Sequence, residues 1–298
     1  MTTERRNPRS VDIDLFPTER ILRIINAEDA IVAGAVASAI PEIAKVVDSS
    51  VEAIRGGGRI FYVGAGTSGR IALLDAVECP STFSTPPEWV QAVVAGGVKA
   101  ISQPTEGFED SREKGASDLR AKKLTAKDLV LGIAASGKTP YTRAALEYAR
   151  AKGARTVAIV SISDSPLAKI ADIVILTPVG PEVITGSTRM KAGTAQKLVL
   201  NMISTAAMIR LGMTYSNWMI NVSMTNSKLR ERGAHILREV LGVNVDEALR
   251  LSEASGGRLK VAVIMGTLGC DRKEAERHLA AGNGNLRKIL GHLGSGRE

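Results

Sequence analysis

Five short runs rich in β-branched and other apolar residues recur along the middle of the chain. They span residues 59–63 (RIFYV), 89–95 (WVQAVVA), 129–134 (LVLGIA), 155–162 (RTVAIVSI) and 172–177 (DIVILT). Runs of this length and composition are typical of buried strands. Segments with helical spacing lie between them, at residues 68–77, 108–122, 141–152 and 165–171. This alternation predicts an α/β fold with a doubly wound, parallel, five-stranded sheet that carries helices on both faces.

The chain on either side of these runs is predicted to be helical. Residues 17–54 carry apolar side chains at helical spacing, which indicates one or two helices covering the sheet. Residues 194–211 form a strongly apolar helix, and the chain then changes to short amphipathic helices separated by glycines. We therefore expect an N-terminal helical segment (1–50), a ligand-binding α/β domain (51–215) and a small C-terminal helical unit (227–298).

Composition narrows the class of function. The chain has 298 residues, of which 44% are hydrophobic and only 3% aromatic, so it can bury a substantial core but is a poor platform for stacking single-stranded nucleic acid. Its net charge of +8 comes from 39 basic residues interleaved with 31 acidic ones. That charge is compatible with an acidic metabolite, with nucleic acid or with an ordinary basic surface. We expect no nucleic-acid partner.

The cysteines and the apolar stretches indicate the cellular compartment in which the protein is expected. Cys79 and Cys270 are far apart, and neither has a CxxC partner or a histidine at metal-ligand spacing, so no disulfide framework and no metal site are predicted. The most apolar uncharged stretches, residues 30–40 and 198–209, are too short to span a bilayer, and the N-terminus lacks the apolar core of a signal peptide. We expect a cytoplasmic protein without membrane contact.

Two loops that directly follow predicted strands have the composition of an anion site. Residues 64–70 (GAGTSGR) follow the first strand, and residues 135–140 (ASGKTP) follow the third. Ligands of open α/β sheets bind beyond the carboxyl ends of strands, where helix N-termini offer unpaired N–H groups. The candidate ligand-binding residues are therefore Gly66, Thr67, Ser68 and Gly69 in the first loop, and Ser136, Gly137, Lys138 and Thr139 in the second.

Other interpretations of these loops stay open. Gly64, Gly66 and Gly69 also match the dinucleotide spacing GxGxxG, although residues 82–88 do not form a second strand that ends in a ribose-binding acid. The second loop lacks the GxxxxGK spacing of a Walker loop. Ordinary helix capping accounts for either loop taken alone, and is a weaker explanation for two such loops on neighbouring strands.

A third segment, residues 186–197 (GSTRMKAGTAQK), follows the last strand and again opens a predicted helix. Its small hydroxyl residues and basic side chains suit an anion, which makes Ser187, Arg189 and Lys191 candidate ligand-binding residues. Alternatively, Arg189 and Lys191 pair with carboxylates at a subunit contact.

These loops and their sheet context resemble the sugar isomerase domain, a flavodoxin-like fold that binds phosphosugars. More narrowly, the strings VGAGTSGR, LDAVECPST, EGFEDSRE, IAASGKTPY and TGSTRMKAGTAQKLVLNM are similar to those of the N-acetylmuramic acid 6-phosphate etherase family. The resemblance starts at Thr3-Glu4 and Asn7 and covers nearly the whole chain. Within it, residues 243–290 resemble a ubiquitin-associated-like three-helix module, for which we expect a role in supporting a dimer or closing the site.

The resemblance implies a lyase that cleaves the lactyl ether at C3 of N-acetylmuramic acid 6-phosphate, giving N-acetylglucosamine 6-phosphate and D-lactate, in the recycling of cell-wall amino sugars. In that reaction the ring-opened aldehyde acidifies the C2 proton, a base removes it, lactate leaves with acid assistance, and water adds to the unsaturated intermediate. The resemblance also implies that no cofactor or metal is needed, and that a homodimer shares its active sites between subunits.

The resemblance assigns the catalytic roles to Glu78 and Glu109. Glu78 is implied to protonate the departing lactate, and Glu109 to act at C2 or on the incoming water. From the residues alone, Glu78 is a surface carboxylate before Cys79-Pro80, where a helix is expected to end, and Glu109 belongs to a solvated, salt-bridged helix face. If Ser68 opens the helix that ends near Glu78, the two lie about 15 Å apart. That span exceeds a hexose phosphate and points to a site completed by a second subunit.

Two other functions use the same loops. An aldose–ketose phosphosugar isomerase shares the phosphate site but neither needs water nor releases lactate. A non-catalytic phosphosugar sensor is the other alternative, although the first fifty residues show no DNA-binding helix-turn-helix. The histidines, His235, His278 and His292, lie in the C-terminal unit without an evident catalytic neighbour, and we expect them to be surface or packing residues.

Overall fold

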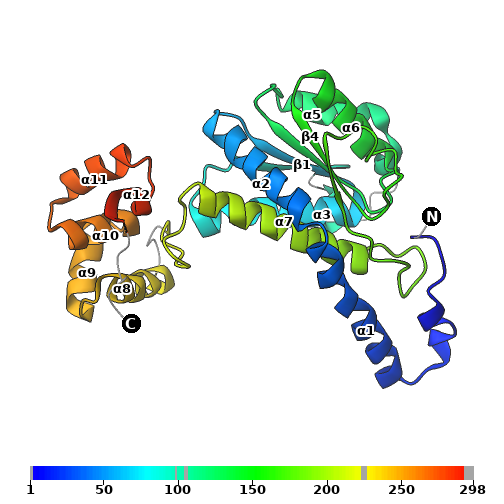
Figure 1. Ribbon diagram of the computed structural model, residues 1–298, viewed down its shortest axis with the longest axis horizontal. Coiled ribbons are helices and arrows are strands. Elements are labelled where there is room, and N and C mark those ends of the chain that lie inside the picture. Colours follow the sequence, from blue (N-terminus) through cyan, green and yellow to red (C-terminus); the bar gives the residue numbers. More distant parts are fainter. Residues whose placement is uncertain (1–2, 98, 104–106, 223–226, 292–298) are drawn as a thin grey trace. The chain divides into compact units, whose positions relative to one another are not determined.

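A computed structural model (Figure 1) describes residues 3–97, 99–103, 107–222 and 227–291. The chain divides into two compact units, one of Met1–Val77 and Pro87–Thr205, the other of Glu78–Pro86 and Ala206–Glu298. Helices α3 (Gly66–Phe83) and α7 (Lys191–Arg210) each contribute residues to both units. Each unit has its own cluster of buried apolar side chains.

A five-stranded parallel sheet forms the centre of the first unit. Its strands are β1 (Ile60–Gly64), β2 (Val90–Val94), β3 (Leu129–Ile133), β4 (Arg155–Val160) and β5 (Ile173–Leu176), in the order β2-β1-β3-β4-β5. Every predicted strand run forms one of them, which confirms the predicted doubly wound parallel sheet. The winding reverses between β1 and β3, and a reversal of this kind is where open α/β sheets bind ligands.

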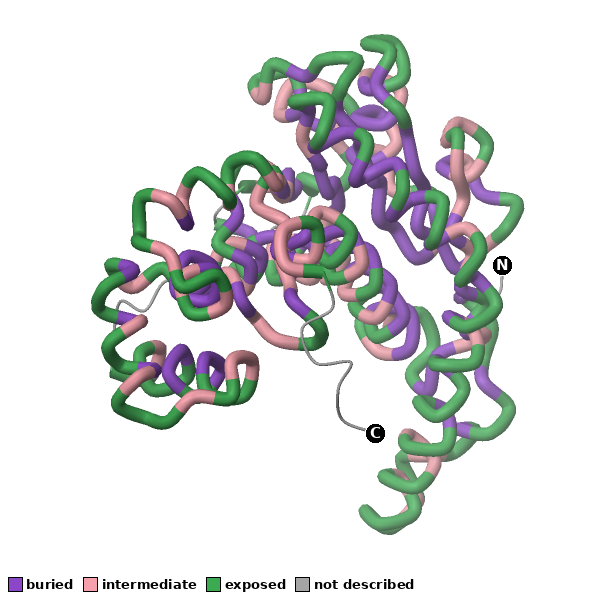
Figure 2. The backbone as a smooth tube through the Cα atoms, turned by 60° about the vertical axis from the view of Figure 1, so that its left-hand side comes forward, coloured by how far each residue is buried: buried purple, intermediate pink, exposed green. Residues whose placement is uncertain are grey.

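Helices cover both faces of the sheet. On one face, α6 (Pro140–Ala151) packs on β1, β3 and β4, and α5 (Arg112–Ala121) packs on α6. On the other face, α2 (Ile40–Arg55) contacts β1, β3 and β5, and α3 and α7 lie on the same side (Figure 1). Residues of β1 and β3 are buried throughout. Figure 2 shows buried and exposed stretches alternating along the helices.

The N-terminal residues form two helices, α1 (Thr18–Ala37) and α2, preceded by short 3-10 turns at Pro8–Ser10 and Ile13–Leu15. The break at Ser38-Ala39 lies just before Pro41, which has no N–H to continue the hydrogen-bond ladder of α1. Among the described residues, no single helix is long and apolar enough to cross a membrane. Only α1 and α2 taken together, across their 60° bend, meet those requirements of length and composition.

Two predicted helices differ from the structure. The segment 165–171 forms turns instead of a helix, because it is tied at both ends: Leu167 N donates to Gly137 O, and Asp172 N donates to Thr156 O to start β5. The segment 108–122 is divided into a 3-10 turn, η3 (Phe108–Asp110), and α5, since Ser111 caps α5 by accepting a hydrogen bond from Lys114 N. A short helix, α4 (Lys99–Ser102), follows β2.

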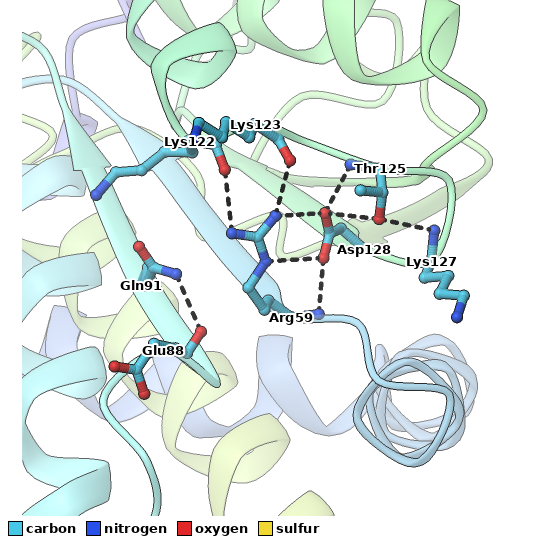
Figure 3. A network of polar contacts seen from close by, with 8 residues as sticks. All are labelled: Arg59, Glu88, Gln91, Lys122, Lys123, Thr125, Lys127 and Asp128. Atoms are coloured by element: carbon cyan, nitrogen blue, oxygen red, sulfur yellow. Dashed lines mark hydrogen bonds and ion pairs between the residues drawn. The ribbon is translucent and has the colours of Figure 1, made fainter.

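A polar network joins the amino ends of β1 and β3 (Figure 3). The Arg59 guanidinium contacts both carboxylate oxygens of Asp128, at 3.1 and 2.9 Å, and donates to the carbonyls of Lys122 and Lys123. Burial alone raises the pKa of Asp128, but hydrogen bonds from Arg59 and Thr125 and the Arg59 charge outweigh it and lower the pKa. The network fixes the relative register of the two strands whose opposite ends carry the candidate loops.

The second unit contains α8 (Ser227–Leu241), α9 (Val245–Ala254), α10 (Leu259–Leu268), α11 (Arg272–Ala281) and α12 (Leu286–Leu290). Lys260 of α10 is buried, and its ammonium donates to two backbone carbonyls. One belongs to Gly212, which follows α7, and the other to Gly284, which follows α11. His235 is exposed and lies edge-on to Trp218, and His278 lies 4.0 Å from Glu274. His292 lies outside the described residues.

Candidate active site

A cleft of about 340 Å³ opens at the carboxyl ends of β1 and β3, within the first unit. Five segments that are distant in the sequence line it. They are the loop after β1 (Ala65, Gly66, Thr67, Ser68), the loop after β3 (Ala134, Ala135, Ser136, Lys138, Thr139, Pro140), the 3-10 turn (Glu109, Asp110), the segment before α7 (Gly186, Thr188) and the N-terminal segment (Glu4). The cleft therefore coincides with the reversal point of the sheet.

The first loop is shaped by two glycines with different tasks. Gly66, the first residue of α3, has a φ of +54°, a conformation that glycine adopts without strain. Gly69 is buried, and a Cβ there would lie 2.6 Å from Val94 Cγ1 and 2.8 Å from Gly64 O. Gly69 thus lets the start of α3 pack against the sheet, and Thr67 and Ser68 line the cleft at the N-terminus of α3, where helix N–H groups have no partner within the helix.

The second loop also contains a tight turn that requires glycine. Gly137 has a φ of +64°, and a Cβ at this position would lie 2.3 Å from Ser165 Oγ, so the tight turn there requires glycine. Ser136 Oγ accepts a hydrogen bond from Lys138 N at 3.3 Å. Thr139 precedes α6 but makes no side-chain hydrogen bond to it, which leaves the first turn of α6 without a hydroxyl cap from this residue.

Glu109 lies in the same cleft as the two loops. It is exposed within η3, whose position is set by Gly107 at a φ of +84° on one side and by the Ser111 cap of α5 on the other. Asp110 lines the cleft beside it. The arrangement brings the Glu109 carboxylate, from the string EGFEDSRE, to the hydroxyl-rich loops after β1 and β3.

Eight lining residues are not among the predicted site residues: Glu4, Ala65, Asp110, Ala134, Ala135, Pro140, Gly186 and Thr188. Thr188 lies between the predicted Ser187 and Arg189, so the hydroxyl-rich string itself was the correct signal. Glu4 lies in the N-terminal part of the family resemblance, but nothing in its local pattern indicates a position beside loops more than sixty residues away.

The other predicted site residues lie elsewhere. Ser187 is half-buried and Arg189 is exposed beside the cleft, but neither lines it. The buried ammonium of Lys191 pairs with Glu28, and the backbone N–H groups of Lys191 and Ala192 donate to the Glu182 carboxylate at 3.0 Å. Lys191 is therefore held within its own chain.

Glu78 is exposed and belongs to the second unit. The expectation that its helix ends near Cys79-Pro80 is wrong, because α3 continues through Pro80 to Phe83. Ser81 Oγ donates to the Glu78 carbonyl at 3.0 Å within this last turn. In the part of the chain that the structure describes, no group of three or more His, Cys, Asp or Glu side chains is arranged to hold a metal ion.

The sheet order is that of a doubly wound α/β domain, and matches to two family models narrow the class to proteins with a SIS domain. Residues 101–206 match the family model of the SIS domain, and residues 42–150 match that of the glucokinase regulatory protein N-terminal SIS domain. The narrower assignment comes from relatives of similar length.

Three N-acetylmuramic acid 6-phosphate etherases illustrate the similarity. The enzyme from Geobacillus thermodenitrificans is 48% identical over 97% of this chain and 98% of its own. That from Symbiobacterium thermophilum is 53% identical over 89% and 88%, and that from Salmonella typhimurium is 46% identical over 98% of both chains. This chain belongs to the N-acetylmuramic acid 6-phosphate etherase family and is an enzyme of the etherase class, which confirms the family that its motifs predicted.

Proposed function

We propose that this enzyme cleaves the D-lactyl ether of N-acetylmuramic acid 6-phosphate by elimination and addition of water. The products are N-acetylglucosamine 6-phosphate and D-lactate, released during the recycling of cell-wall amino sugars. The observation that carries the proposal is the cleft itself, in which the hydroxyl-rich loops after β1 and β3 lie together with the carboxylate of Glu109. The groups proposed for phosphate binding and the carboxylate proposed for proton transfer thus line the same cleft.

The two loops suit the phosphate of the substrate. The N-termini of α3 and α6 direct backbone N–H groups and the positive ends of their dipoles toward the loops. The hydroxyls of Thr67, Ser68, Ser136 and Thr139 and the ammonium of Lys138 add further donors along the lining of the cleft. We propose that these groups bind the phosphate at C6 and so fix the rest of the sugar relative to Glu109.

We propose that Glu109, which lines the cleft, takes part in proton transfer at the sugar. In the ring-opened substrate the C1 aldehyde acidifies the proton at C2, and a carboxylate base removes it. The electron pair left at C2 forms a double bond to C3, and the lactyl oxygen leaves C3 with a proton from an acid. Water then adds its oxygen to C3 and a proton returns to C2, so that the net reaction consumes one water. We propose that Glu109 acts at C2 or on the water.

Glu78 is proposed to supply the proton to the departing lactate of a neighbouring subunit's site. Ten residues of α3 separate it from Ser68, which corresponds to about 15 Å along a helix and exceeds the length of a hexose phosphate. The same part of α3 carries two large apolar side chains, Leu74 and Val77, that are 45% and 56% exposed. Apolar residues exposed together on one helix favour a subunit contact. We therefore propose a homodimer with shared sites.

Two further parts of the proposal concern context. Because a phosphate dianion does not cross a lipid bilayer, we propose that the enzyme acts in the cytoplasm, where the phosphorylated sugar is retained. We also propose that the C-terminal helical unit (227–298) supports the dimer or closes the site.

The deciding experiment is an assay of D-lactate released from N-acetylmuramic acid 6-phosphate, run in deuterium oxide. The wild-type enzyme is expected to release lactate and to incorporate deuterium at C2 of the product. Glu109→Gln and Glu78→Gln are expected to lose at least about a hundredfold in kcat, the scale of general acid–base catalysis. Isomerisation of the sugar without lactate release would establish the isomerase alternative, and binding without turnover would establish a sensor.

Mixed dimers test the shared site. Glu78→Ala chains combined with Glu109→Ala chains regenerate one complete site in each mixed dimer if Glu78 serves the partner. Random pairing of equal amounts of the two chains makes half of all dimers mixed, and each mixed dimer has one complete site out of two. Activity should therefore return to about a quarter of the wild-type value. Mixed dimers that are verified by tagging and stay inactive would contradict the shared site.

A further inference from the structure

The N-terminal segment of the chain is fastened to the segment that precedes α7. Asn7 Nδ2 donates to the Pro181 carbonyl at 3.1 Å, and Ser10 Oγ donates to the Val183 carbonyl at 2.7 Å. Asn7 and Ser10 are buried, as is Thr3 beside Glu4. Partners 173 and 174 residues apart in the sequence are thus joined by buried hydrogen bonds, so the two segments form one wall.

A cluster of polar contacts around the buried carboxylates of Glu28 and Glu182 holds this wall in place. Glu28 of α1 contacts Arg9 of the N-terminal segment at 3.2 Å and Lys191 at the start of α7 at 2.5 Å. Glu182 caps the same end of α7 through the N–H groups of Lys191 and Ala192. The cluster connects α1, α7 and both segments of the wall. Removing Lys191 would leave the buried Glu28 carboxylate without its buried ion-pair partner.

This wall delivers Glu4 to the active-site cleft. Glu4 lines the cleft together with Gly186, and a Cβ built on Gly186 would lie 3.3 Å from Glu4 Oε2. Among the described residues, the Glu4 carboxylate has neither an ion-pair nor a hydrogen-bond partner, although it lies in a segment that is otherwise fastened by buried contacts. A positioned carboxylate of this kind offers acceptor oxygens to whatever occupies the cleft.

The negative charge of Glu4 limits which groups of the substrate it can bind. An ionised carboxylate accepts hydrogen bonds and repels anions, so it excludes the phosphate and the lactyl carboxylate as its partners. The donors left on an N-acetylated amino sugar are the ring hydroxyls and the amide N–H. Building on the proposed function, we infer that Glu4 is a further substrate-binding residue, whose carboxylate accepts a hydrogen bond from a sugar hydroxyl or the acetamido N–H.

The test separates sugar binding from phosphate binding. Glu4→Ala and Glu4→Gln are compared with wild type in lactate release from N-acetylmuramic acid 6-phosphate and in inhibition by inorganic phosphate. A hydrogen bond to a charged group that is lost in Glu4→Ala should raise KM about tenfold or more, with kcat within about twofold of wild type. The inhibition constant of inorganic phosphate should stay the same or fall, and Glu4→Gln should show a smaller rise in KM.

The matched control is Asp14→Asn, which removes a carboxylate from the same N-terminal segment at an exposed position outside the cleft. It should match wild type in every constant. An unchanged KM in Glu4→Ala would overturn the inference, and so would a phosphate inhibition constant that rises in step with KM, since that result marks a general disturbance of the cleft.

Calorimetric titration with N-acetylglucosamine 6-phosphate and with inorganic phosphate distinguishes failure of this inference from failure of the proposed function. If wild type releases no lactate, the proposed function fails. If Glu4→Ala binds the sugar phosphate more weakly than wild type does but binds phosphate equally well, Glu4 is still established as a sugar-binding residue. If Glu4→Ala and wild type bind each probe with the same affinity, the inference about Glu4 is overturned.

Discussion

Lys191 Nζ lies 2.5 Å from Glu28 Oε2, in an ion pair whose side chains are only 1% and 4% exposed. Burial alone raises the pKa of Glu28, but hydrogen bonds from Lys191 and Asn7 and the charges of Lys191 and Arg9 outweigh it and lower the pKa. The Glu28 carboxylate is therefore charged at neutral pH. The pair joins α1 to the start of α7, directly after the segment that lines the cleft with Gly186 and Thr188.

Removing one member of this pair should be more harmful than removing both. Lys191→Met leaves the buried Glu28 carboxylate with Arg9 and Asn7 as its remaining partners, and we expect it to cost about 3 kcal/mol in the free energy of unfolding. The double variant Lys191→Met/Glu28→Leu should regain much of that loss. Urea unfolding of the two single variants and the double variant measures the coupling. Additive effects in the double variant would show that the two side chains do not interact.

Phosphate affinity should depend on the hydroxyl of the second loop. Ser136→Ala removes a cleft hydroxyl without altering the turn at Gly137, and we expect the inhibition constant of inorganic phosphate to rise about tenfold. Ser163→Ala serves as the control, because Ser163 is exposed and does not line the cleft. An equal inhibition constant in Ser136→Ala and wild type would place the phosphate elsewhere.

Acid stability should depend on Asp128. Its pKa in the folded chain lies below the ordinary value of 3.8, so its stabilising effect is complete above that value and is lost as the pH falls through the lower folded pKa. Asp128→Asn should be less stable than wild type at pH 7 by about 2–3 kcal/mol. The difference should shrink as the pH falls below 3.8. Urea unfolding from pH 7 to pH 2.5 follows this convergence, and a constant difference would contradict it.

A dependence of the same sign, but at alkaline pH, should appear in the second unit at Lys260. Burial lowers the pKa of this ammonium from 10.5 to about 8, so between these values the folded chain binds fewer protons than the unfolded chain. The contribution of Lys260 to stability should therefore rise with pH across this window, by about 1.4 kcal/mol per pH unit at most. The stability of wild type relative to Lys260→Met, measured at pH 7, 8, 9 and 10, reveals the effect because other titrating groups cancel. A relative stability that does not vary with pH would refute it.

The sheet and the two main loops were predictable because their signals are local. β-Branched runs such as Ile60–Gly64 and Leu129–Ile133 bury every residue, and the glycine-rich strings that follow them can only turn tightly into helices. The helix expected at residues 165–171 failed for a non-local reason, since contacts with Gly137 and Thr156 hold that segment in turns. The passage of α3 through Pro80 also went against the local rule for proline.

The candidate site was predictable only where it is built from contiguous strings. Thr67, Ser68, Ser136 and Thr139 follow from the loops, whereas the partner of Lys191 lies 163 residues away and no periodicity indicates it. A basic residue at the start of a helix, such as Lys191, suggests anion binding from the sequence. The sequence does not reveal that a distant carboxylate, here Glu28, already pairs with it. The catalytic roles of Glu78 and Glu109 came from family resemblance, and they stay predictions until the variants are assayed.

The most direct test of the phosphate site is a crystal structure of Glu109→Gln with intact N-acetylmuramic acid 6-phosphate bound. The phosphate oxygens should lie within hydrogen-bond distance, about 3 Å, of Ser68 and Ser136, with the ether carbon beside residue 109. Density for the phosphate outside the loops that follow β1 and β3 would contradict the account.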